Sequence, residues 1–169
     1  HVRSRLRNTE WRVKFRERKV MTKDVIISIR GLQVLVDENG EQEPVEVLNT
    51  GQYYYKNNQH YILYDEPAEG FEETTHNILK FNKNKLEVRK RGLMEVHMIF
   101  EENKKNISMY QTPFGVMDMG IATTRIELTE EPERIFLEVD YALEMGGSYV
   151  GDCNIQLLVQ ARTKENLAL

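Results

Sequence analysis

The side chains best suited to metal or nucleophilic chemistry are four histidines and one cysteine: His1, His60, His76, His97 and Cys153. No two histidines have the i, i+4 spacing of a helical zinc motif, and one cysteine cannot build a thiolate zinc cage. On strands, His60 would share a face with Glu66 and His76 with Glu72, which makes a metal site conceivable without favouring one. We therefore expect no metal site and interpret Cys153 as a packed thiol.

Motifs for covalent or phosphate chemistry are also missing from the sequence. There is no G-x-S-x-G, no P-loop and no G-x-G-x-x-G. Gly146 and Gly147 have the character of a hairpin connection, because no helix follows them to supply a positive end for phosphate. We expect neither catalytic residues nor a cofactor, and hence a protein that is not an enzyme.

A basic triplet, Arg89-Lys90-Arg91, is the most suggestive binding feature. On a strand, Arg89 and Arg91 point to one face and Lys90 to the other. Two readings remain open: a solvated outer face, or an Arg91 guanidinium that turns inward and meets a carboxylate such as Glu66 or an anionic ligand. The eight tyrosines fit either core packing with hydroxyls at the rim or the lining of a polar cavity.

Charge divides the 169 residues into two parts. Residues 1–20 carry eight cations and two anions, a net charge of +6, while the rest carries 15 cations and 25 anions, a net charge of −10. Three interpretations of the basic part remain open. It is an extension upstream of a natural start at Met21, an arm that binds polyanions, or a strand in which Trp11, Val13 and Phe15 alternate with cations. The acidic body repels phosphate, so we expect no nucleic-acid partner for it. No apolar run can span a bilayer, and we expect a cytoplasmic protein.

From Val25 to Ala161 the apolar pattern has a period of two, which predicts strands. Gly31 shifts the phase by one residue, as a β-bulge does. Asn57-Asn58, Asn82-Lys83-Asn84 and Gly146-Gly147 are typical of tight turns. Ten strands are expected, over residues 25–36, 45–55, 61–65, 72–81, 85–91, 94–100, 107–112, 116–128, 135–143 and 149–161.

The connections are too short for parallel crossovers, so the strands must form an antiparallel meander. A sheet of this size avoids exposed edges best when it closes on itself. We predict an all-β protein: a single up-and-down β-barrel of about 8–10 strands over residues 21–162. It would lie between the basic extension at 1–20 and a C-terminal tail at 163–169.

Several motifs occur in a fixed order: Gly51-Gln52-Tyr53-Tyr54, Tyr61 to Glu66, Arg89 to Gly92, Phe100, and Tyr110-Gln111-Thr112-Pro113-Phe114-Gly115. Together they resemble the YwiB-like family of small bacterial proteins, a domain of unknown function. The resemblance implies a calycin-like barrel, related in shape to lipocalins, and a ligand in its interior. Within these motifs the polar candidates for ligand binding are Tyr64, Glu66, Arg91, Tyr110 and Thr112.

Two functions follow as expectations. The first is binding of a small amphipathic or anionic ligand in the barrel, with Arg91 and the tyrosines as polar anchors. The second is a protein-interaction or oligomerisation module, such as a homodimer, whose barrel is filled by side chains.

Overall fold

The computed structural model describes residues 23–36, 42–67, 72–92, 95–112 and 115–162. These residues form ten strands: β1 (Asp24–Val36), β2 (Gln42–Lys56), β3 (Gln59–Pro67), β4 (Thr74–Phe81), β5 (Lys85–Arg91), β6 (Val96–Glu101), β7 (Lys104–Thr112), β8 (Gly115–Glu131), β9 (Arg134–Met145) and β10 (Ser148–Ala161). The described ranges hold no helix that is long and apolar enough to cross a membrane. The predicted extension at 1–20 and tail at 163–169 lie outside them.

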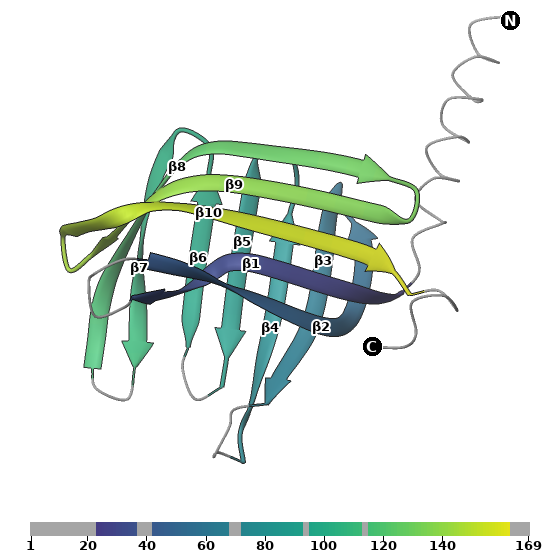
Figure 1. Cartoon of the computed structure of the whole chain (residues 1–169), viewed down its shortest axis with the longest axis horizontal. Coiled ribbons are helices and arrows are strands. Elements are labelled where there is room, and N and C mark those ends of the chain that lie inside the picture. Colours follow the sequence, from purple (N-terminus) through teal and green to yellow (C-terminus); the bar gives the residue numbers. More distant parts are fainter. Residues whose placement is uncertain (1–22, 37–41, 68–71, 93–94, 113–114, 163–169) are drawn as a thin grey trace, which may run out of the picture.

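All ten strands belong to one antiparallel sheet in the order β6-β5-β4-β3-β2-β1-β10-β9-β8-β7. Each ladder joins strands that are neighbours in sequence, except that β1 also pairs with β10. Strands β8, β9, β10, β1 and β2 cross in front of β3 to β7 (Figure 1). The predicted all-β, up-and-down barrel is confirmed, and the barrel is nearly closed.

The backbone conformation at the turns and at the bulge agrees with the sequence-based predictions. Asn57 and Asn58 both have positive φ between β2 and β3, and Gly146 and Gly147 both have positive φ between β9 and β10. Such pairs twist with the flanking strands and close two-residue hairpins. Gly31 has φ +87°, and the β1–β2 register shifts just after Arg30, so the predicted bulge is confirmed.

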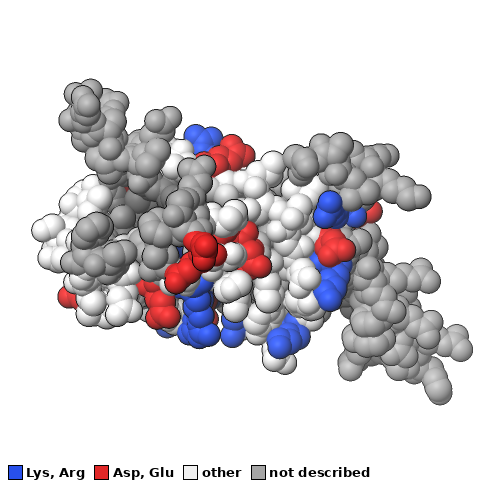
Figure 2. Space-filling model, turned by 90° about the horizontal axis from the view of Figure 1, so that it is seen from below, with Lys and Arg blue, Asp and Glu red and all other residues white. Residues whose placement is uncertain are grey.

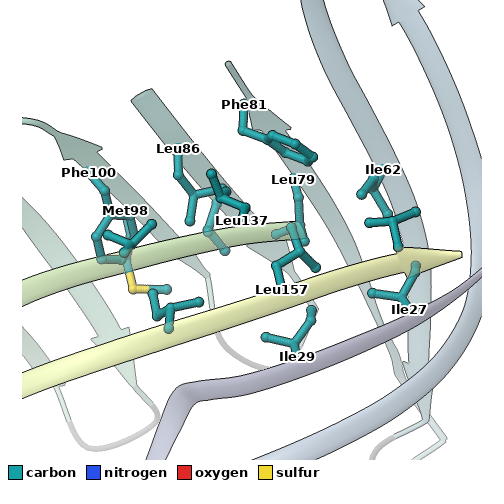
Figure 3. Packing of buried hydrophobic residues seen from close by; sticks show 14 of the residues in the cluster. Ile27, Ile29, Ile62, Leu79, Phe81, Leu86, Met98, Phe100, Leu137 and Leu157 are labelled. Carbon is teal, nitrogen blue, oxygen red and sulfur yellow. The ribbon is translucent and has the colours of Figure 1, made fainter. Parts of the chain in front are cut away.

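The centre of the barrel is filled by apolar side chains rather than open. Strands β1, β9 and β10 contribute Ile27, Ile29, Leu137 and Leu157, which face side chains from β3 to β6 (Figure 3). The opposing set comprises Ile62, Leu79, Phe81, Leu86, Met98 and Phe100. Because these side chains are buried and in mutual contact, the polar chemistry of the interior is confined to the two ends.

The two ends of the barrel differ in character. One end, which we call the aromatic end, holds the β2–β3, β4–β5, β6–β7 and β8–β9 connections. The other, the polar end, holds the remaining hairpin connections and the last residues of β3, β5 and β7. Seen from below, toward the lower ends of β3, β5 and β7, basic and acidic side chains are interspersed (Figure 2).

Candidate functional site

A group of polar side chains points inward near the polar end, and we call it the interior cluster: Tyr64, Glu66, Asn77 and Lys90. Each continues the inward-facing apolar positions of its strand, since Ile62, Leu79 and Val88 are buried two residues away from Tyr64, Asn77 and Lys90. Strand register aligns the cluster. Tyr64 lies opposite Asn77 across β3–β4, and Asn77 lies opposite Lys90 across β4–β5.

Glu66 is the acceptor on which this cluster converges. Its Oε1 accepts from Asn77 Nδ2 at 3.0 Å and from Lys90 Nζ at 3.4 Å. The ammonium and the carboxylate compensate each other, as buried charges must. Burial, and then the nearby charge of Glu66, raise the pKa of the Tyr64 phenol, so Tyr64 stays neutral and keeps its proton for hydrogen bonding.

The inward-facing reading of Arg91 is wrong. Arg91 is exposed on the outer face, and the inward cation that meets Glu66 is Lys90, whose side chain is 13% exposed. The reason is the period of the strand: Leu86 and Val88 face inward, so Lys90 is the next residue on that face. Of the five predicted residues, the structure brings Tyr64 and Glu66 together.

Tyr110 is half-buried on β7 and packs against the apolar core. The side chain of Thr112 lies outside the described residues, although its backbone completes β7. Sequence reasoning did not single out Asn77 or Lys90 as inward polar groups. The signal for both was the apolar alternation of their own strands, with Leu79 and Phe81 following Asn77.

The barrel is interrupted where β6 and β7, the two edges of the sheet, meet. In the described part of the chain one isolated bridge, Glu95–Gln111, joins them, and the Gln111 N–H donates to the Glu95 carbonyl at 3.4 Å. A groove of about 500 Å³ lies here, which we call the seam groove. It is lined by Arg89, Lys90, Arg91, Glu95, Val96, His97, Met109, Gln111 and Val116.

The two sides of the seam groove are chemically different. Strand β5 contributes the basic triplet, while β7 and β8 contribute Met109 and Val116, both large exposed apolar side chains. Arg89 and Arg91 carry the positive charge of the groove, because Lys90 is paired with Glu66, and Glu95 is the one acidic residue of the lining. Arg91 thus lines a groove on the outside of the barrel, at the seam between β6 and β7, and not the barrel interior.

The aromatic end is closed by a plug made of Tyr53, Tyr55, His60 and Phe81. The His60 ring stacks on Phe81 and meets Tyr55 edge-on, each at a centroid distance of 4.9 Å. Its Nδ1 bonds the Tyr53 hydroxyl at 2.7 Å, and its Nε2 bonds Glu130 Oε1 at 2.6 Å. A carboxylate can only accept, so Nε2–H donates to Glu130. We assign His60 the tautomer with its proton on Nε2, in which Nδ1 accepts from the Tyr53 hydroxyl.

Within the described residues, the other two histidines each bond one carboxylate. His76 bonds Asp65, and His97 bonds Glu87. No group of three or more His, Cys, Asp or Glu side chains in the described ranges could hold a metal ion. Cys153 packs against the core, and burial raises the pKa of its thiol, which favours the unreactive protonated form.

Comparison with known proteins places the chain in a family. The profile of the family described as "Domain of unknown function (DUF1934)" matches residues 27–157. The chain belongs to this family. It is also 25% identical, over 112 residues, to the "Uncharacterized beta-barrel protein YwiB" of Bacillus subtilis (strain 168), an alignment that covers 66% of this chain and 78% of that protein.

The fold agrees with a solved structure of the same relative. The crystal structure of ywiB protein from Bacillus subtilis superposes with a TM-score of 0.68 at 22% identity, covering 86% of this chain and 97% of that one. At this identity the likeness shows the fold alone. The predicted resemblance to the YwiB-like family is confirmed, and the arguments about ligands rest on the residues of this chain.

Proposed function

We propose that this protein binds a small amphipathic anion in the seam groove, and that its role is binding rather than catalysis. The observation that carries the proposal is the pairing of a basic wall, Arg89 and Arg91, with an apolar wall, Met109 and Val116, around about 500 Å³. Pockets for small molecules span roughly 300–1,000 Å³ and combine apolar walls with a few polar anchors. An anionic head on the arginines and an alkyl chain on the apolar wall match this lining.

Because the core is filled by side chains, the seam groove is a better site for an alkyl chain than the barrel interior. Ile27, Leu79 and Leu157 are almost fully buried at the centre, so a chain could enter there only by displacing packed side chains. The calycin resemblance suggested a ligand inside the barrel, whereas this proposal places the ligand in the seam groove on the outer face. Charge complementarity sets the sign of the ligand.

Titration calorimetry with decanoate, below its micelle threshold, tests this proposal. We expect the double variant Arg89→Gln/Arg91→Gln to bind at least tenfold more weakly, because it loses charge-assisted hydrogen bonds of about 1.5–3 kcal/mol each. Arg134→Gln is the matched control, since Arg134 is exposed at the start of β9, at the other end of the barrel. Equal affinity in all three proteins, or equal binding of a decyl-ammonium cation, would contradict the proposal.

A second candidate function is homodimerisation through the same region. Ile107 and Met109 are 69% and 61% exposed on the outer face of β7, an edge strand, and Val116 is exposed beside them on β8. Exposed edges and apolar patches of this kind favour association. Analytical ultracentrifugation decides: a dimer that Ile107→Lys converts to a monomer supports this function, whereas a monomeric parent excludes it.

A further inference from the structure

The interior cluster contains a buried acceptor that nothing in the described protein satisfies. Asn77 is 1% exposed, and its Nδ2 donates to Glu66 Oε1 and to the Thr75 carbonyl. Its Oδ1 is buried without a hydrogen-bond partner. Buried polar atoms are nearly always paired, so an orphaned oxygen of this kind calls for a donor from elsewhere.

The charges around Asn77 restrict what that donor can be. The Lys90 ammonium and the Glu66 carboxylate already compensate each other, so the cluster needs no further ion. A ligand carboxylate would be repelled by Glu66, and a ligand cation would be repelled by Lys90. A neutral group with hydroxyl hydrogens suits both partners, because a hydroxyl donates and accepts at once.

The polar atoms are arranged for adjacent hydroxyls. Both described bonds to Glu66 go to Oε1. The second carboxylate oxygen and Asn77 Oδ1 can therefore accept from a ligand, while the Lys90 ammonium and the Tyr64 hydroxyl can donate. We propose that the interior cluster binds a small neutral polyhydroxylated molecule, whose vicinal hydroxyls donate to Asn77 and Glu66 and accept from Lys90. This site shares Lys90 with the lining of the seam groove, but its other members, Tyr64, Glu66 and Asn77, do not line the groove, and it takes a different class of ligand.

Access to Asn77 requires Lys90 to move. The side chains of Lys90 and Glu66 are 13% and 23% exposed, so the cluster reaches solvent on their side. Their contact of 3.4 Å is longer than the usual 2.7–2.9 Å of a charge-assisted hydrogen bond. A hydroxyl entering between Lys90 and Glu66 would restore the bonds of both groups and reach Asn77.

Side-chain amide NMR of the full chain tests the site, with glycerol, erythritol and glucose as probes. We expect a saturable shift of the Asn77 amide signals with at least one polyol, and none with acetate or methylammonium. Asn77→Leu should weaken the affinity, followed on neighbouring backbone amides, at least tenfold. Thr123→Val is the matched control, because Thr123 is buried with an unpartnered hydroxyl and belongs to β8.

Glu66→Gln provides a second variant if Asn77→Leu fails to fold, and it should also weaken binding because an amide is a poorer acceptor than a carboxylate. Polyols stabilise proteins nonspecifically, so non-saturating shifts of equal size in the parent and the variants would overturn the proposal. A crystal soaked in the best polyol that shows an ordered water alone at Asn77 Oδ1 would also overturn it. Loss of decanoate binding in the groove variants would leave this result unaffected.

Discussion

The Tyr53–His60 hydrogen bond in the aromatic plug offers the sharpest test of how the barrel is held closed. His60 is 4% exposed and connects Tyr53 on β2, through its own strand β3, to Glu130 on β8. In the sheet order β2 and β3 are neighbours, but β8 lies far from both, so the chain of bonds spans the end of the barrel. The perturbation is a double-mutant cycle with Tyr53→Phe, His60→Phe and the two changes together.

The magnitude follows from which atoms lose a partner. Tyr53→Phe leaves His60 Nδ1 buried without this donor, at a cost of about 1–3 kcal/mol in the free energy of unfolding. His60→Phe leaves the Tyr53 hydroxyl without this acceptor at a similar cost, although a phenyl ring can still stack on Phe81. The double variant removes both halves of the pair, and such replacements are often nearly neutral. We therefore expect a coupling energy of about 1–2 kcal/mol.

Urea unfolding followed by circular dichroism measures the four free energies, and a thermal melt gives a second reading. For a domain of this size, 1 kcal/mol corresponds to roughly 2–4 °C in the midpoint. Tyr54→Phe is the matched control, because the Tyr54 hydroxyl is exposed and bonds Gln52 at 3.2 Å. It should cost no more than about 0.5 kcal/mol. Additive losses in the cycle would refute the reasoning, since they would show that the two side chains act independently.

Three further predictions concern the rest of the fold. Gly31→Ala should destabilise the barrel by more than about 2 kcal/mol in urea unfolding, because φ is +87° and a Cβ would lie 1.9 Å from the Asn154 carbonyl oxygen. Burial alone would raise the pKa of Glu87, but its hydrogen bond to His97 and nearby cations outweigh burial and lower it. Ionised Glu87 therefore stabilises the fold above its unfolded pKa. The deficit of Glu87→Gln, about 1 kcal/mol or less at pH 7, should vanish as pH falls through the folded pKa in a pH series of melts. Arg125→Met should lower the melting temperature by leaving three carboxylates of the outer face uncompensated, and the deficit should shrink in high salt.

Most of the fold could be predicted from the sequence because local chemistry determines it. The period-two pattern predicts the ten strands, and short connections exclude parallel pairing. Positive-φ residues such as Asn57, Asn58 and Gly146 mark hairpins that any antiparallel meander needs. These features depend on residues close together in the chain. They were therefore accessible without knowledge of the closed sheet.

The candidate site was predicted less well, and the reason differs from residue to residue. Lys90 could have been assigned to the interior, because it continues the alternation of Leu86 and Val88. The prediction of Arg91 rested on the neighbouring Gly92, and the alternation of the strand was the better guide. The partnership of His60 with Glu130 had no such signal. It links residues 70 positions apart, and it depends on how far the strands tilt as the sheet closes.

The distribution of polar groups follows from one constraint on this barrel. Its centre is packed with apolar side chains, so every inward polar group has to reach either solvent or a partner at one of the two ends. At the aromatic end the bonds of His60 to Tyr53 and Glu130 meet that requirement for the buried histidine, whereas the buried Thr123 hydroxyl on β8 has no partner. At the polar end it is met incompletely, because Asn77 Oδ1 has no partner. The unpartnered Asn77 oxygen is the reason why the proposed polyol site lies at the polar end, where a hydroxyl of a small molecule would supply the missing donor.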